Sequence, residues 1–208
     1  MSIPSKHEFL TKITLDLENE KLVLPTFPDV AIQARSAADD VNTTAHQLAD
    51  IINTDVALSA RLLKVANSPL YRARNKIDNI QIAITRMGNR VVRNLIMSIT
   101  VEQMFHSTSK FLAKKFKASW EHSIQVAAIS RALAKTTPHL DPEQAMLAGL
   151  FHDIGVLPIL MAAEDYPELL IKPAILDELI DNIHTDVGKL IVEHWDFPDS
   201  LTEVVWEH

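Results

Sequence analysis

Apolar side chains recur at helical spacing in segment after segment of this chain. Over residues 7–18 they fall at Phe9, Leu10, Ile13 and Leu17, which lie on one face of an α-helix. No segment shows the strict alternation of apolar and polar residues that is typical of a strand. Only 4 glycines stand against 10 prolines, a balance that favours helices separated by prolines over a sheet with many tight turns. The sequence therefore predicts an all-α fold.

The ends of several helices can be recognised from capping residues. Thr44 and Gln47 have the spacing of a capping box, and Asp141 followed by Pro142 is a strong helix start. Pro69 ends the helix before it, because proline disfavours helical backbone at the preceding residue. The helices expected from these residues and from the periodicity cover about residues 7–18, 28–40, 44–53, 55–66, 80–88, 89–104, 109–135, 141–153, 156–162, 174–194 and 199–208.

The most informative stretch is residues 147–155, where His152 and Asp153 stand side by side between apolar residues. Burying a carboxylate without a partner costs several kcal/mol, so Asp153 needs a metal ion, a cation or several hydrogen bonds. Neighbouring side chains on a helix point about 100° apart, so a His nitrogen and an Asp oxygen can converge beside it. Imidazole with carboxylate suits Zn, Fe or Mn. Gly149 and Gly155 leave room for an ion or for another helix.

The same pair also has a purely structural interpretation. His152 could donate a hydrogen bond to a carbonyl group while Asp153 caps a neighbouring helix, so that the pair only holds two helices together. His122 and His184 lie at helical positions and are open to both interpretations. His208, at the last position of the sequence, is the weakest candidate, because terminal residues are often poorly ordered.

Composition and charge narrow the class of protein. The chain has no Cys, so it can form no disulfide and has no thiolate chemistry. We find no run of about 18 apolar residues, so no membrane span is expected, and the N-terminus lacks the apolar core of a signal peptide. A cytoplasmic protein is the default expectation. The net charge of −7 argues against a general nucleic-acid-binding protein.

Positive charge is concentrated in one stretch of the chain. Between residues 61 and 93 a run of basic side chains is opposed by a single acidic residue, Asp78. The basic residues are Arg61, Lys64, Arg72, Arg74, Lys76, Arg86, Arg90 and Arg93. Such a patch could hold a phosphate, a nucleotide or an acidic segment of a protein partner. A solvated helix face is the simpler interpretation.

A polar break at residues 106–110 suggests the boundary between two parts. Residues 1–105 would form an N-terminal helical subdomain, and residues 106–208 a second helical subdomain that contains His152 and Asp153. The second part is acidic, with 16 Asp and Glu against 8 Lys and Arg.

Several motifs, in order along the chain, resemble those of the HDOD family, a branch of the HD-domain superfamily. In the first part they are Leu24-Pro25-x-x-Pro28, residues 51–58, residues 65–71 and Ile80-Gln81-x-Ala83-Ile84. In the second part they are Trp120-x-His122-Ser123, residues 148–155, His184-x-x-Val187-Gly188 and Trp195-Asp196-Phe197-Pro198. The resemblance covers about residues 20–208 as one HDOD domain. It implies an N-terminal helical bundle packed on an HD-like helical core.

The resemblance also implies a ligand set. Catalytic HD domains bind one or two metal ions through a His, a His-Asp pair and a later Asp. His122 matches the first His, and His152 with Asp153 matches the pair. The related HD-GYP proteins, which hydrolyse cyclic di-GMP, add further histidines where His184 and, less clearly, His208 fall. If this centre is functional, its cofactor would be a divalent ion: Mn, Fe, Mg or Zn.

Two departures from the catalytic pattern bear on activity. Active HD-GYP proteins continue His-Asp-Ile-Gly-Lys, whereas Val156 takes the place of that Lys here. The later Asp has no evident counterpart, and a natural protein of this family is expected to continue past His208. The loss of one anionic ligand weakens a divalent site.

Two functions are therefore expected from the resemblance. The first is a non-catalytic regulatory module of a signalling pathway, which binds a protein partner or a small anionic ligand. HDOD proteins are mostly regarded as such modules, and the two departures favour this function. The second is a metal-dependent phosphohydrolase, either a phosphatase or a nucleotide phosphodiesterase, in which His152 and Asp153 are the central residues.

Overall fold

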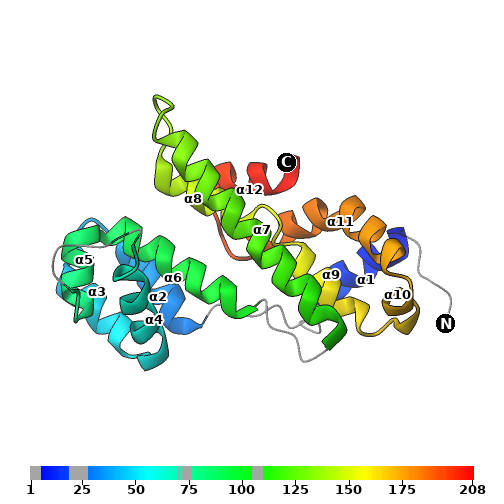
Figure 1. Ribbon diagram of the computed structural model, residues 1–208, viewed down its shortest axis with the longest axis horizontal. Coiled ribbons are helices and arrows are strands. Elements are labelled where there is room, and N and C mark those ends of the chain that lie inside the picture. Colours follow the sequence, from blue (N-terminus) through cyan, green and yellow to red (C-terminus); the bar gives the residue numbers. More distant parts are fainter. Residues whose placement is uncertain (1–5, 19–27, 70, 72–75, 105–109) are drawn as a thin grey trace. The chain divides into compact units, whose positions relative to one another are not determined.

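A computed structural model describes residues 6–18, 28–69, 71, 76–104 and 110–208 of the chain (Figure 1). This described part is helical and contains no β-strand, which confirms the all-α prediction. The helices are α1 (Lys6–Glu18), α2 (Asp29–Asp39), α3 (Ala45–Asn53), α4 (Val56–Ala66), α5 (Ile80–Met87), α6 (Asn89–Met104), α7 (Lys110–Ala134), α8 (Pro142–Phe151), α9 (Val156–Ala163), α10 (Pro167–Ile171), α11 (Pro173–His194) and α12 (Asp199–Glu207).

The chain divides into two compact units. One consists of Thr26–Met104 and carries α2 to α6; we call it the inserted unit. The other consists of Met1–Pro25 together with Phe105–His208 and carries α1 and α7 to α12; we call it the histidine unit. The histidine unit is thus discontinuous in sequence, because the inserted unit lies between its two segments.

The inserted unit is a bundle whose helix ends agree with the capping residues of the sequence. In the bundle α2 packs against α3 and α6, α3 against α5, and α4 against α5 and α6. The predicted capping box is confirmed: the Gln47 N–H donates to Thr44 Oγ1 (3.2 Å), and the Thr44 N–H donates to Gln47 Oε1 (2.9 Å). Gly88 ends α5 at a φ of 83°, a backbone conformation that glycine adopts without strain.

The histidine unit is built around α7, α8 and α11. The helices α7 and α8 form a hairpin, α11 packs against α9 and α12, and α12 also contacts α8 (Figure 1). The first helix, α1, packs against α11 and α9, with Phe9 and Ile13 fully buried. This arrangement differs from the division at residue 105 expected from the sequence, which placed α1 with the N-terminal bundle. The polar break marks one joint between the units, but the side chains of α1 determine where that helix packs.

Residues Pro142–Ala163 are long and apolar enough to cross a membrane, by length and composition alone. They form α8, the turn after it and α9. In the structure 72% of the most apolar 18 residues of this stretch is buried, as is common in the core helices of soluble proteins. The sequence has no uninterrupted run of about 18 apolar residues here, because Glu143, His152 and Asp153 lie within the stretch.

Candidate metal centre

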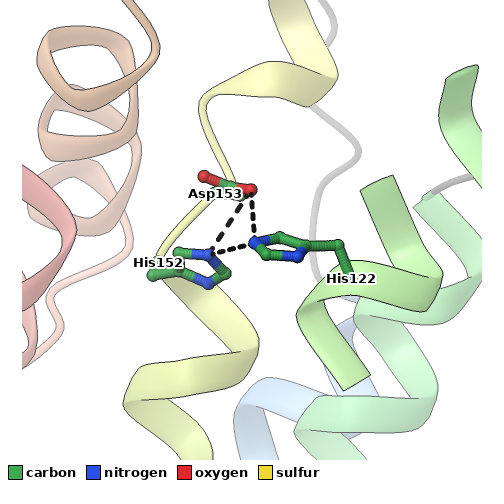
Figure 2. A group of neighbouring side chains, drawn as sticks. All are labelled: His122, His152 and Asp153. Carbon is green, nitrogen blue, oxygen red and sulfur yellow. Dashed lines mark hydrogen bonds and ion pairs between the residues drawn. The ribbon is translucent and has the colours of Figure 1, made fainter. Parts of the chain in front are cut away.

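The centre forms where the chain turns between α8 and α9. Helix α8 ends at Phe151, residues 152–155 form a turn, and α9 begins at Val156. The N–H of Val156 donates to the carbonyl of Asp153 (3.0 Å), which closes the turn. His152 and Asp153 therefore project from a short break in an apolar segment. Figure 2 shows them with His122, which reaches them from α7.

Two glycines let neighbouring helices approach this turn at backbone distance. A Cβ on Gly149 would lie 2.9 Å from the Cα and the N of Ala127 on α7. A Cβ on Gly155 would lie 1.9 Å from the carbonyl oxygen of His184 on α11. Only hydrogen fits at either position. The first approach brings α7, and with it His122, to the turn, and the second brings His184.

Each oxygen of the Asp153 carboxylate faces a different pair of imidazoles. Its Oδ2 lies 3.4 Å from Nε2 of His152 and 3.6 Å from Nε2 of His122 (Figure 2). Its Oδ1 lies 3.2 Å from Nε2 of His208 and 3.6 Å from Nε2 of His184. Within the described residues, these atoms form two sets of three donors that could each hold a metal ion, with Asp153 common to both.

Three of the four imidazoles are oriented by backbone carbonyl groups. The Nδ1 of His152 lies 2.8 Å from the carbonyl oxygen of Gly149, and the Nδ1 of His184 lies 2.8 Å from that of Ile180. The Nδ1 of His208 lies 3.1 Å from the carbonyl oxygen of Val205. A carbonyl oxygen only accepts, so each Nδ1 carries a proton, and in the neutral form of the ring Nε2 keeps its lone pair. Metal-binding histidines commonly have such an outer hydrogen bond.

The Nε2 atoms then face one another in pairs. The distance is 3.1 Å between His122 and His152, and again 3.1 Å between His184 and His208. Two lone pairs at this separation repel unless a proton or a cation lies between them. A divalent ion bound to both nitrogens and to the adjacent oxygen of Asp153 would remove that repulsion. The donor set therefore fits a metal ion on chemical grounds.

The carboxylate and the imidazoles shift one another's pKa. Burial acts to raise the pKa of Asp153, but the hydrogen bond from His208 and the nearby imidazoles lower it overall. The same hydrogen bond raises the pKa of His208, against the effect of burial. Burial lowers the pKa of His152, although Asp153 lies close to it. In the metal-free protein the hydrogen bond with Asp153 thus favours the protonated form of His208, whereas burial favours the neutral form of His152.

The centre is more open on one side than on the other. The side chain of His152 is 9% exposed and that of His184 is 18% exposed, whereas the side chain of His122 is 54% exposed. The centre is therefore most accessible to solvent beside His122.

The structure brings together all five residues that the sequence put forward for a metal site: His122, His152, Asp153, His184 and His208. His208 is the weakest of the candidates predicted from the sequence, yet its Nε2 is the imidazole nitrogen nearest to Asp153. The carbonyl groups that orient the imidazoles were not predicted. A backbone acceptor has no side-chain signature, so no residue type could have indicated them.

The predicted basic patch lies in the inserted unit, apart from this ligand set. Arg61 and Lys64 are exposed on α4, and Lys76 is exposed before α5. Arg93 on α6 forms an ion pair with Asp39. Arg86 and Arg90 are exposed at the end of α5 and the start of α6, while Arg72 and Arg74 lie outside the described residues. The patch stays a prediction.

Comparison with known proteins identifies the family. The model of the HDOD domain matches residues 24–208, so the chain belongs to the HDOD family. Among solved structures it is similar to a proposed metal-dependent phosphohydrolase from Shewanella amazonensis SB2B. The identity is 32% and the TM-score 0.81, over 97% of this chain and 74% of that one.

Two further relatives are more distant. An HDOD domain protein of unknown function from Geobacter sulfurreducens is 26% identical, with a TM-score of 0.71, over 94% of this chain and 69% of that one. An uncharacterized protein of Treponema pallidum (strain Nichols) is 25% identical over 215 residues, which are 95% of this chain and 40% of that protein. The chain thus spans less than half the length of this curated relative.

Proposed function

We propose that this HDOD domain binds divalent metal ions at Asp153 and hydrolyses a phosphate ester there. The observation that supports the proposal is the shared carboxylate: each oxygen of Asp153 faces one pair of imidazole nitrogens. His122, His152 and Asp153 would hold one ion, and Asp153, His184 and His208 a second. An arrangement that only held helices together would have no reason to gather four imidazole Nε2 atoms around one carboxylate.

The donor set also limits the kind of metal. Imidazole nitrogens suit Zn, Fe and Mn, whereas Mg prefers oxygen ligands and keeps several waters. With four imidazoles to one carboxylate, Mn, Fe or Zn fits this centre better than Mg. The name of the Shewanella amazonensis relative, a proposed metal-dependent phosphohydrolase, supports the same reaction class.

The residues of the chain have separate tasks in this proposal. A bound divalent ion supplies a water of lowered pKa and polarises a phosphoryl oxygen. The carbonyl groups of Gly149, Ile180 and Val205 hold the imidazoles in one tautomer and one orientation, so the site needs little reorganisation when it is loaded. The exposed ring of His122 borders the side from which a phosphate ester would enter.

Val156 supports a second candidate function. Active HD-GYP proteins carry a Lys after the glycine of the turn. Here the apolar side chain of Val156 is buried at that position, so it supplies no cation for a phosphate. In the second candidate the domain is a cytoplasmic signalling module. It binds a protein partner or a small anionic ligand, and any metal bound at Asp153 only maintains its structure.

Metal analysis followed by hydrolysis assays separates the two candidates. The protein is purified without chelator, analysed for Mn, Fe and Zn, and assayed with p-nitrophenyl phosphate and bis(p-nitrophenyl) phosphate in the presence of Mn²⁺. The proposal expects bound metal and turnover of at least one substrate, both lost in Asp153→Asn. Bound metal without turnover would favour the signalling module. If the protein contains no metal and shows no turnover, the proposal is wrong.

A pair of variants on one helix provides the control. His184→Ala should weaken the binding of the ion held by Asp153, His184 and His208 by more than the roughly 10–100-fold that the loss of an outer hydrogen-bonding partner costs. His194→Ala, at the exposed end of the same helix, should leave metal binding unchanged. Equal losses in both variants would mean that the effect comes from α11 as a whole and not from the ligand.

A further inference from the structure

We infer that the centre consists of two halves, each held at its spacing by separate glycine contacts, so that one half can be disabled while the other keeps its metal. The inference rests on the proposed function, because it concerns how this chain positions the metal ligands. Gly149, Gly155 and Gly188 would then be positioning residues of the site.

The first half depends on the contact between α8 and α7. The hydrogen atoms of Gly149 face the backbone of Ala127, and a Cβ would lie 2.9 Å from both Cα and N of that residue. His122 lies on α7 five residues before Ala127. The carbonyl of Gly149 is also the acceptor for Nδ1 of His152. One residue thus sets the distance to α7 and orients the imidazole that pairs with His122.

The second half depends on a chain of two contacts. Gly155 lies against the backbone of α11, where a Cβ would be 1.9 Å from the His184 carbonyl oxygen and 2.5 Å from the Gly188 nitrogen. Gly188 in turn lies against α12, where a Cβ would be 2.7 Å from Cγ1 of Val205. His208 follows Val205 by three residues. The first contact places His184 beside Asp153, and the second places His208 beside His184.

The contacts differ in whether a compensating substitution can relieve them. The atoms that a Cβ would meet at Gly149 and Gly155 belong to the backbone, so alanine there forces whole helices apart. At Gly188 the conflicting atom is a methyl group of Val205, which a second substitution can remove. Gly188→Ala is therefore the variant that folds most readily and can be rescued.

The test counts Mn²⁺ ions in the full chain by electron paramagnetic resonance of free and bound Mn²⁺. The wild-type protein should bind two ions, and their magnetic coupling should give a hyperfine splitting half that of an isolated ion. In Gly188→Ala one ion should remain, with its affinity unchanged and the coupling absent, while the second binds about 10–100-fold more weakly. In Gly188→Ala/Val205→Ala the second ion and the coupling should return.

A glycine elsewhere in the chain separates positioning from general destabilisation. Gly88 has a positive φ of 83° and open space around its Cα, so Gly88→Ala strains the inserted unit without touching the centre. This variant should melt at a lower temperature than wild type and still bind two coupled Mn²⁺ ions. Loss of one ion in Gly88→Ala would assign the effect to stability and overturn the inference.

The remaining outcomes are also decisive. Two coupled ions of unchanged affinity in Gly188→Ala, or equal weakening of both ions, would contradict the division into halves. If the wild-type protein binds no Mn²⁺, the proposed function loses its support. The placement of the imidazoles by the glycines can then be tested through the imidazole NMR signals of the metal-free protein. Gly188→Ala should move the signals of His208 and His184 and leave that of His122 in place. Movement of all three would reject the inference in that case.

Discussion

The ionised carboxylate of Asp153 is stabilised by several imidazoles, and its charge influences the protonation of those imidazoles in turn. Its lowered pKa keeps it ionised, and the hydrogen bond to His208 raises the pKa of that imidazole. In the metal-free protein the two therefore form a partly buried ion pair over a defined range of pH. His152 behaves in the opposite way to His208, because burial lowers the pKa of His152 and so disfavours its protonated form.

The pair predicts a pH-dependent contribution to folding. A carboxyl group with a lowered pKa contributes stability above its unfolded-state pKa and loses it as the pH falls through its folded-state value. An imidazole with a raised pKa contributes stability below its unfolded-state pKa and loses it as the pH rises through its folded-state value. The Asp153–His208 contribution should therefore be largest at mildly acidic pH, and it is expected to be about 1 kcal/mol.

Urea unfolding of metal-free wild type and His208→Gln across this range measures the contribution. The difference in unfolding free energy should be greatest between the two folded-state pKa values and should shrink on either side. A difference that is constant with pH would show that His208 acts by packing alone. Added metal should reverse the alkaline limb, because metal binding requires deprotonated Nε2 atoms and strengthens as the pH rises.

At the scale of elements, α11 ends in a tight turn that contains a residue with positive φ. Asp196 has a φ of 53°, the Asp196 N–H donates to the Glu193 carbonyl, and the Phe197 N–H donates to the Val192 carbonyl. This pattern is a Schellman motif, in which glycine usually holds the left-handed position. The motif turns Phe197 back onto Phe151, whose ring centroid lies 5.0 Å away and which immediately precedes His152.

The left-handed position predicts a stability difference between two variants. Asp196→Gly and Asp196→Ala both remove the carboxylate, so their difference reports only the backbone conformation. Asp196→Gly should be the more stable by about 1 kcal/mol, since a Cβ is disfavoured at positive φ. Thermal or urea unfolding measures it. If Asp196→Ala equals Asp196→Gly, the turn has changed conformation or does not limit stability.

Helices were easier to predict from the sequence than the geometry of the centre. Periodicity and capping residues gave the long helices and the capping box at Thr44, because those interactions are local. Helix α10 was not predicted, because its five residues span little more than one turn and show no repeat of apolar spacing. The pairing of His184 with His208 depends on the approach of α12 to α11, and an approach of two helices has no local signature in sequence.

At the scale of the whole molecule, the first helix belongs with the last hundred residues. Phe9 is fully buried and its ring lies 5.4 Å from that of Tyr166 in the histidine unit. The sequence could not show this, because the apolar face of α1 indicates only that some partner exists. The choice between the two units depends on the complementary surface that α9 and α11 present.

Substitution of Phe9 tests this assignment. Phe9→Ala should destabilise the histidine unit by about 3–5 kcal/mol. Native-state hydrogen exchange should then show faster exchange of amides in α9 and α11, with little change in α6. Leu48→Ala, at a fully buried position of the inserted unit, is the reciprocal control and should accelerate α3 and α6. Equal acceleration of both units by either variant would mean that they unfold as one.

The discontinuity of the histidine unit has a consequence for biosynthesis. A ribosome completes residues 26–104 before it makes α9 and α11. The inserted unit can therefore fold before the two helices that pack against α1 have been synthesised. Throughout that interval the apolar face of α1, with Phe9, is exposed on the nascent chain. The chain is therefore most vulnerable to aggregation between the synthesis of residue 104 and that of α11.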